Sequence, residues 1–159
     1  MDIVMIEKEQ LPLCLEVIHK SFETVARDLG FTEQNCPGHT SFMKIEKLNN
    51  FWEWGFMMFG LWDKEELVGY YSLSDKGGGR YELHNLAVIP ERRHCGCGKT
   101  LLDDAKKRSR EAGATTLILS FIEESAILKQ WYLSNGFKHI GTEKYEHLPF
   151  AVGLMEFAL

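Results

Sequence analysis

The chain contains 159 residues, 45% of them hydrophobic and 26% charged, and its formal net charge is −5. These values are typical of a soluble globular protein, and we expect residues 1–159 to form a single domain. The acidic balance argues against nucleic acid or an anionic membrane as a partner, and no segment has the length of a membrane span or the form of a signal peptide.

The first half of the chain predicts a strand, two helices and then a hairpin. Ile3–Ile6 is a short apolar run typical of a strand. Apolar residues at helical spacing predict a helix from Glu9 to about Leu29, and Gly30 is a residue type that ends helices. A breaker around Pro37 precedes a second helix, which we expect to begin at Thr40 or Ser41 and end near Asn50.

The remaining elements are predicted by alternating apolar runs, turn residues and two further helical segments. The expected strands are Phe56–Trp62, Leu67–Leu73, Tyr81–Ile89, Thr115–Phe121, Phe137–Tyr145 and Val152–Leu159, and the expected helices are Gly98–Ala112 and Ser125–Asn135. The order β-α-α-β-β-β-α-β-α-β-β predicts a mixed sheet with helices packed on it, in the α/β (α+β) class.

The junction between the strand that ends in Leu86-Ala87-Val88 and the following helix carries the clearest functional signal. It contains Arg93-His94-Cys95-Gly96-Cys97-Gly98 directly before the helical pattern. Glycines at the start of a helix allow close approach of a ligand, and the free N–H groups there attract anions. We therefore expect a phosphorylated ligand at this loop.

This part of the chain resembles the GCN5-related N-acetyltransferase (GNAT) superfamily, whose members transfer acetyl groups from acetyl-CoA to amines. The loop fits the family's [Gln/Arg]-x-x-Gly-x-[Gly/Ala] pattern, and Leu86-Ala87-Val88 is a usual sequence before it. About forty residues later, Tyr132-Leu133-Ser134-Asn135-Gly136-Phe137 matches the family's Tyr-x-x-x-Gly-Phe helix end. The order of the elements fits as well, whereas Ser125 stands where many members carry Asn.

The resemblance implies an acetyl-CoA site. Backbone N–H groups of the loop would hold the pyrophosphate, and Arg93 and Lys99 would add positive charge. The strand before the loop would pair with the pantetheine arm, and Val88 N–H would donate to the thioester carbonyl. The residues implied for the cofactor are Leu86, Ala87, Val88, Arg93, His94, Cys95, Gly96, Cys97, Gly98, Lys99, Ser125 and Tyr132.

Two side chains on the same strand are candidates for the base that deprotonates the amine. Strand alternation predicts that Glu82, His84, Leu86 and Val88 share one face. A carboxylate or an imidazole of tuned pKa suits this task, and we favour Glu82 slightly over His84. The competing interpretation, that both are polar residues of a partly solvated strand, is equally weighted.

The family commonly has a tyrosine at the position of Tyr132 that protonates the leaving thiolate. A phenol is protonated at neutral pH and can act as an acid there. The competing interpretation is an aromatic ring that packs the helix on the sheet beside Trp131; we favour the acid.

The four cysteines do not form a pattern typical of a disulfide scaffold, so we expect a cytoplasmic protein. Cys95 and Cys97 lack the partner pair that a metal site needs, and no metal is expected. Their position at a helix N-terminus predicts thiols that are more acidic and more easily oxidised than usual.

The acceptor is predicted only as a primary amine of a small molecule or of a peptide or protein. Aromatic residues at Phe51–Trp54 and at Tyr145, His147 and Phe150 are candidates for its pocket, although such residues more often form core. An acyl-CoA sensor of the same fold without turnover is the alternative function. The oligomeric state is left open, a homodimer included. A nucleotide site is disfavoured because the chain lacks Gly-x-x-x-x-Gly-Lys-[Ser/Thr].

Overall fold

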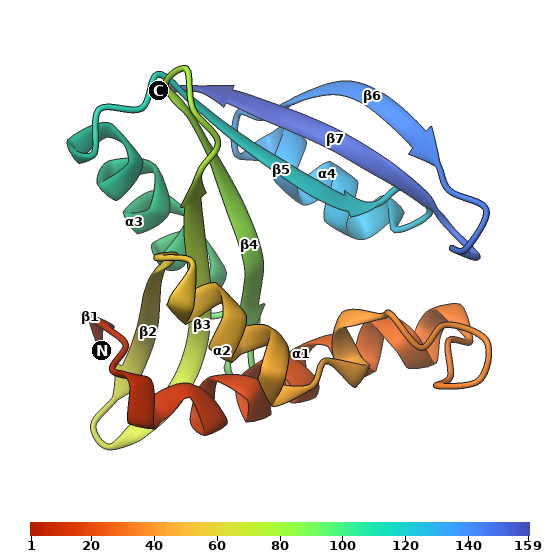
Figure 1. Ribbon diagram of the computed structural model, residues 1–159, viewed down its shortest axis with the longest axis horizontal. Coiled ribbons are helices and arrows are strands. Elements are labelled where there is room, and N and C mark those ends of the chain that lie inside the picture. Colours follow the sequence, from red (N-terminus) through yellow and green to blue (C-terminus); the bar gives the residue numbers. More distant parts are fainter.

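The computed structural model describes residues 1–159, and the order of its elements agrees with the predicted order. One seven-stranded sheet has the order β1-β2-β3-β4-β5-β7-β6 (Figure 1). Its strands are β1 (Asp2–Met5), β2 (Met57–Asp63), β3 (Glu66–Asp75), β4 (Arg80–Val88), β5 (Thr116–Ile122), β6 (Lys138–Lys144) and β7 (Ala151–Ala158). The helices are α1 (Leu11–Leu29), α2 (Ile45–Glu53), α3 (Cys97–Glu111) and α4 (Ala126–Ser134). The mixed α/β class is confirmed.

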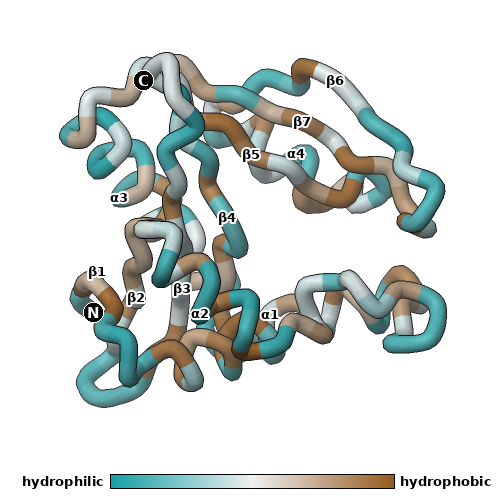
Figure 2. The backbone as a smooth tube through the Cα atoms, in the orientation of Figure 1, coloured by the Kyte–Doolittle hydropathy of each residue, from teal (hydrophilic) through white to brown (hydrophobic).

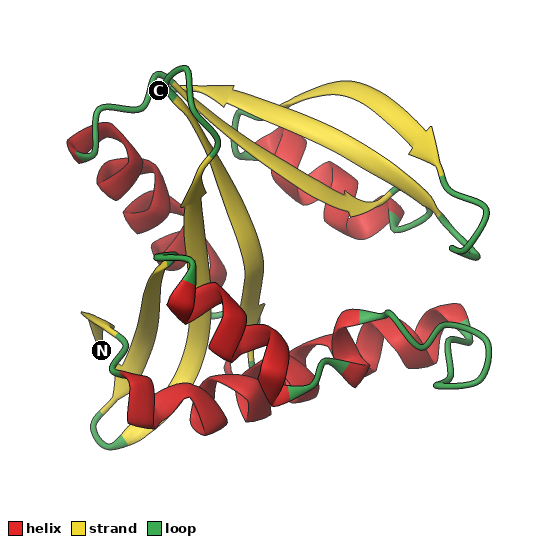
Figure 3. Cartoon of the chain, in the orientation of Figure 1, coloured by secondary structure: helices red, strands yellow, loops and turns green.

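The helices lie on both faces of this sheet (Figure 3). Helices α1 and α2 cover one face of the β1–β4 half, and the Phe51 ring on α2 lies 5.8 Å from the His84 ring on β4. Helix α3 covers the opposite face, where Tyr71 on β3 donates a hydrogen bond to Asp104. Helix α4 adjoins α3, since the Lys106 ammonium donates to the Asn135 carbonyl at the end of α4.

The sheet opens at its centre. Strands β4 and β5 form the only parallel pair, and their pairing covers just Arg80–Glu82 against Thr116–Ile118. Beyond Glu82 the two strands separate, as Figure 1 shows, and the rest of β5 pairs only with β7. The outer part of β4 therefore has a backbone edge that no strand of the sheet covers.

A bulge in β4 interrupts the predicted alternation. Ser72 is opposite His84 but Tyr70 is opposite Ala87, so Asn85 and the residue after it face a single residue of β3. Asn85 adopts the left-handed backbone conformation with φ of 52°. Asn tolerates this conformation better than most residue types, and a bulge of this kind reverses the facing of every later residue.

The prediction that Glu82, His84, Leu86 and Val88 share a face is consequently wrong beyond His84. Glu82 and His84 face α1 and α2, together with Ala87. Leu86 and Val88 face α3. Val88 is paired with Gly69, and paired residues face the same side of a sheet; an added Cβ at Gly69 would lie 2.8 Å from Leu101 of α3.

The hydrophobic core occupies both sides of this sheet. Strand β5 begins as one of the most hydrophobic segments of the chain (Figure 2). Helix α1 begins two residues later than predicted, after a 3-10 turn at Lys8–Gln10, and ends at Gly30 with φ of 72°. The second helix begins at Ile45, because Thr40–Phe42 forms a separate 3-10 turn. No helix combines the length and the apolar character needed to cross a bilayer.

Candidate functional site

The loop between β4 and α3 is shaped by two left-handed residues. After a 3-10 turn at Pro90–Arg92, His94 has φ of 59° and Gly96 has φ of 87°. Gly96 is the N-cap of α3, without a side chain to bond the first N–H groups of the helix. An added Cβ at Gly96 would find no atom within 4 Å, so the space in front of this residue is open.

This loop leaves a continuous row of backbone donors. Arg93 N–H donates to Pro90 and Thr100 N–H donates to Gly96, but the six N–H groups of His94–Lys99 between them donate to no acceptor of the chain. Successive free N–H groups around left-handed residues, together with a helix N-terminus, form a concave anion site. These six N–H groups are therefore free to bind an anion, and the anion site at this loop stays a prediction.

The two arginines beside the loop point away from it. The guanidinium of Arg93 donates to the Ser21 carbonyl at 2.6 Å and to Thr24 Oγ1 at 2.8 Å, both on α1. Arg92 lies 2.7 Å from Asp63 on the β2–β3 hairpin. Of the expected cations, Lys99 is exposed at the helix start and pairs only with Asp103, one turn later. The expectation that Arg93 adds charge to the pyrophosphate site is not met, since its donors hold the loop against α1.

The open edge of β4 carries N–H groups that no strand uses. Val88 N–H, the expected donor to the thioester carbonyl, donates to Ser21 Oγ of α1 at 3.3 Å. N–H groups alternate along a strand, so that of Leu86 points to the same side. Ser21 is buried and also lies 3.5 Å from an Arg93 nitrogen. Sequence reasoning missed Ser21, because nothing in a helical pattern distinguishes a serine that reaches a strand edge.

The two candidate bases are adjacent on the α1 and α2 side of β4. Glu82 and His84 are 3.6 Å apart, Glu82 is 3.4 Å from Lys76, and the His84 Nε2 atom forms a hydrogen bond of 2.7 Å with Ser74 Oγ. The His84 ring stacks on Phe56 at 5.0 Å.

Burial lowers the pKa of His84 below its ordinary value, although the Glu82 carboxylate acts in the opposite direction. The imidazole is therefore neutral at pH 7, the form that can accept a proton. Glu82 sits at the last β4–β5 pair, whereas His84 is two residues further along, where the strands separate. Sequence reasoning did not identify Ser74, because only the strand register shows that it adjoins His84.

Tyr132 lies on the side of the sheet occupied by α3 and α4. It is 6% exposed, and its ring contacts those of Trp131 at 5.0 Å and Phe137 at 5.5 Å. Burial raises its pKa well above the usual range of a phenol. Its hydroxyl forms no hydrogen bond, although it is not among the completely enclosed polar atoms of the chain. The residue thus packs the helix and also keeps a protonated hydroxyl without a partner.

The second half of α4 lies against the first turn of α3. An added Cβ at Gly98 would lie 3.4 Å from the Trp131 ring, so the two helices approach closely at this point. Ser125 occupies the N-cap position of α4, but its side chain makes no capping hydrogen bond. Its hydroxyl is therefore not engaged as a helix cap, and its contact with the cofactor stays a prediction.

The expected acidity of the loop thiols is wrong for Cys97. Its side chain is buried, and burial is the largest effect that raises its pKa above the ordinary value, with a contribution from Cys95. Burial outweighs the helix N-terminus here, since a buried thiolate loses more hydration than the helix dipole returns.

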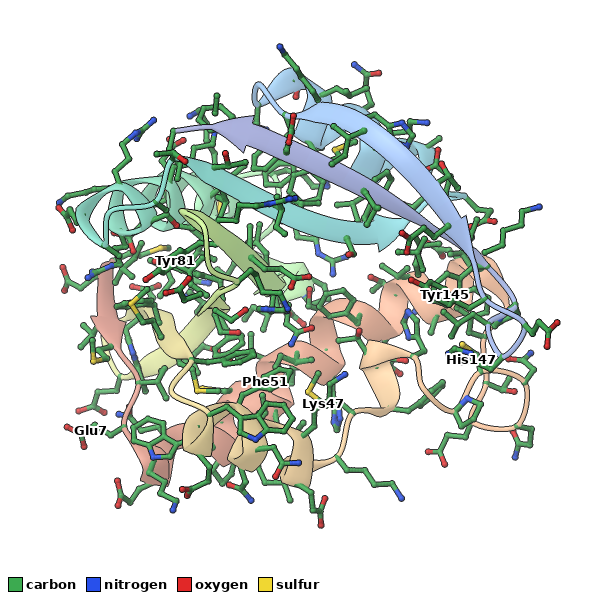
Figure 4. All side chains as sticks on the ribbon, turned by 45° about the horizontal axis from the view of Figure 1, so that its top comes forward. Glu7, Lys47, Phe51, Tyr81, Tyr145 and His147 are labelled. Atoms are coloured by element: carbon green, nitrogen blue, oxygen red, sulfur yellow. The ribbon has the colours of Figure 1, made fainter.

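The opposite side of the sheet opening is bounded by the β6–β7 connection. Figure 4 shows Tyr145 and His147 of this connection beside the segment that follows α1, with Lys47 and Phe51 on α2. The Phe150 ring contacts Phe31 at 5.4 Å. The aromatic candidates for an acceptor pocket are thus divided between two places, since Phe51 packs against Phe56 next to His84.

A family model described as the GNAT family of acetyltransferases matches residues 24–137 of the chain. This range includes β4, the loop between β4 and α3, α3 itself and the helix that carries Tyr132. A comparison with curated proteins returned no similar sequence.

Solved structures of acetyltransferases share the fold. A PaiA N-acetyltransferase from Thermoplasma acidophilum in complex with coenzyme A is 23% identical, with TM-score 0.81 and 100% of both chains covered. A ribosomal-protein-alanine N-acetyltransferase from Brucella melitensis is 21% identical, with TM-score 0.76 and 100% of both chains covered. The ribosomal-protein-S18-alanine N-acetyltransferase from Escherichia coli is 16% identical, with TM-score 0.78, 99% of this chain and 92% of that chain covered.

Proposed function

The chain belongs to the GNAT family of acetyltransferases, and from that premise we propose that it transfers the acetyl group of acetyl-CoA to a primary amine by direct attack on the thioester. The observation that carries the proposal is the row of free N–H groups from His94 to Lys99, directly after the uncovered edge of β4. Coenzyme A has a pyrophosphate and an extended pantetheine arm. The helix start can bind the pyrophosphate, and the N–H groups of the strand edge can donate hydrogen bonds to the arm.

The loop fits the pyrophosphate. Its N–H donors are backbone groups, so the side chains of His94, Cys95 and Cys97 need not contribute, and the open space at Gly96 admits a close approach. The Leu86 and Val88 N–H groups would orient the pantetheine arm. For Val88 N–H to donate to this arm, its hydrogen bond to Ser21 Oγ must break. Acetyl-CoA supplies an activated acyl group with a thiolate leaving group.

We assign the base to His84, assisted by Glu82. An amine is protonated near neutral pH and must lose a proton before it attacks. The neutral imidazole can accept this proton, and the Glu82 carboxylate at 3.6 Å stabilises the cation that forms. Ser74 holds the Nε2 atom, so Nδ1 is the nitrogen left to meet a proton directly or through water.

We assign the acid to Tyr132. Its pKa, raised by burial, keeps the phenol protonated over the whole neutral range, so it can give a proton to the departing thiolate. The free hydroxyl and the nearby contact between α3 and α4 support a position close to the thiol end of the cofactor.

The acceptor is proposed as a primary amine of a small molecule or of a peptide, reaching the opening between β4 and β5 from the α1 and α2 side, where Glu82 and His84 lie. We also propose a cytoplasmic location, because all four cysteines are free thiols and acetyl-CoA is abundant in that compartment.

A thiol-release assay tests the function. The protein is mixed with acetyl-CoA and a panel of polyamines, aminoglycosides, amino acids and peptides with free N-termini, and CoA is measured as it forms. We expect amine-dependent release with at least one class. Binding of acetyl-CoA without release across the panel supports the acyl-CoA sensor instead, and absence of binding contradicts both.

A further inference from the structure

Two thiols stand next to each other inside the anion-binding loop. The Sγ atoms of Cys95 and Cys97 are 3.5 Å apart, on either side of Gly96. Cys95 is exposed, and its thiol donates to the Arg92 carbonyl at 2.8 Å. Cys97 is buried in the first turn of α3, with the Met1 sulfur 3.7 Å away on its other side. The pair is unlike Cys14 and Cys36, which are buried and have no thiol beside them.

The arrangement separates two roles that dithiol oxidation needs. An exposed thiol meets a soluble oxidant first, and a protected thiol within contact distance then completes the bond. A disulfide requires an S–S distance of about 2.05 Å, so the two sulfurs must approach by only a small movement. The segment that must adjust has glycines at 96 and 98, which tolerate changes of backbone dihedral angles.

We propose that Cys95 and Cys97 form a reversible disulfide on exposure to a peroxide, and that this bond weakens the binding of acetyl-CoA. The Cys95 thiolate attacks one peroxide oxygen, which gives a sulfenic acid and one water. Cys97 then gives up its thiol proton as its sulfur attacks the Cys95 sulfur, the S–O bond breaks, and the hydroxyl leaves with a proton as a second water. Two thiol hydrogens and two electrons pass to the peroxide. A low-molecular-weight thiol reverses the change by exchange.

The effect on the cofactor follows from where the ring closes. The N–H groups of Gly96 and Cys97 lie within the bridged segment, in the middle of the row that holds the pyrophosphate. A direct bridge changes the dihedral angles that aim them. Loss of one charge-assisted hydrogen bond weakens binding about tenfold. This inference rests on the proposed function, because it assumes that the loop binds CoA.

The sequence makes the bond easy to detect. Trypsin cleaves after Arg93 and Lys99, so one peptide, His94–Lys99, contains both loop cysteines and no other. The protein is treated with hydrogen peroxide, free thiols are alkylated, and the digest is analysed by mass spectrometry. We expect this peptide without alkyl groups and with a mass two hydrogens below that of its dithiol form, while the peptides with Cys14 and Cys36 are alkylated. Dithiothreitol should restore the alkylated form.

Calorimetric titration with CoA measures the consequence. The ratio of Kd after and before peroxide should rise about tenfold in the unsubstituted protein and in Cys36→Ser, and should stay at one in Cys95→Ser, whatever the Kd of that variant is. A peptide that stays dialkylated, a sulfinic acid at Cys95, or a disulfide with unchanged Kd overturns the proposal. If the reduced protein itself fails to bind CoA, the proposed function is wrong, and the two failures are thereby distinguished.

Discussion

At the scale of single residues, the same side chain serves packing and chemistry. The sequence predicts that Tyr132 is either an acid or a packing aromatic, and its ring does pack against Trp131 and Phe137. Its hydroxyl has no partner, although buried polar groups are normally hydrogen-bonded. The motif identified the position, but only the packed structure shows that the ring is buried between Trp131 and Phe137 while its hydroxyl has no hydrogen-bond partner.

The acid role of Tyr132 predicts a loss of rate without a loss of packing. Tyr132→Phe keeps the ring and removes the proton donor, so we expect kcat to fall roughly 10²-fold while the Kd of acetyl-CoA stays nearly the same. Steady-state kinetics and titration measure the two quantities. Tyr81→Phe on β4 is the matched control and should retain the rate. An equal rate in both variants would assign Tyr132 to packing alone.

A second residue-scale prediction concerns pH. His39 is buried among Phe22, Phe31 and Phe42, and burial lowers its pKa below the ordinary value of 6.5. The unfolded chain therefore binds a proton more readily than the folded one, and the free energy of unfolding must fall as the pH drops below about 6.5.

The contribution of His39 is isolated by urea unfolding of the protein and of His39→Asn at about pH 7.5 and about pH 5.5. We expect a smaller decrease in the free energy of unfolding in His39→Asn. The lowered pKa of His84 acts in the same direction in both proteins and cancels in the comparison. An equal decrease in both would show that His39 titrates normally.

At the scale of the elements, periodicity predicted the order of strands and helices, because each element has one apolar face or stripe. It failed at β4, where a one-residue insertion at Asn85 reverses the facing of Leu86 and Val88. A bulge is a property of the pairing of two strands and leaves little trace in one of them. The separation of β4 from β5 likewise leaves no trace in the sequence of either strand.

The bulge makes a prediction about Asn85. With φ of 52°, this position accepts glycine and resists branched side chains. Asn85→Val should lower the free energy of unfolding by roughly 1–2 kcal/mol relative to Asn85→Gly. Urea denaturation measures the difference. Equal stability of the two variants would mean that the strand can pair without the left-handed residue.

The loop–helix contact predicts that Arg93 acts on stability. Arg93→Ala removes two hydrogen bonds to α1 and should lower the free energy of unfolding by about 1–3 kcal/mol without cofactor. Lys99→Ala, on the exposed first turn of α3, should leave the stability nearly unchanged and weaken CoA binding. Thermal unfolding and titration separate the two effects. Unchanged stability together with weaker CoA binding in Arg93→Ala would show that Arg93 binds the pyrophosphate instead.

At the scale of the whole molecule, the site exists because two halves of the sheet meet over only three residue pairs. The β1–β4 half carries the candidate bases and the loop proposed to bind the pyrophosphate, and the β5–β7–β6 half carries the helix with Tyr132. The sequence predicted both motifs and their spacing. It did not predict that α1 reaches the open strand edge through Ser21, since that contact joins residues 67 positions apart.

The central claim is that the loop before α3 binds the pyrophosphate of acetyl-CoA, and two glycines of the same helix test it. Gly96 and Gly113 both have φ of 87° with open space around them, one before α3 and one after it, so an Asp at either position meets the same backbone strain. The measurement is the rise in melting temperature that acetyl-CoA produces in the unsubstituted protein, in Gly96→Asp and in Gly113→Asp. We predict that Gly113→Asp retains the rise and that Gly96→Asp abolishes it, because its carboxylate crowds and repels the pyrophosphate. An undiminished rise in Gly96→Asp, or no rise in the unsubstituted protein, would contradict the account.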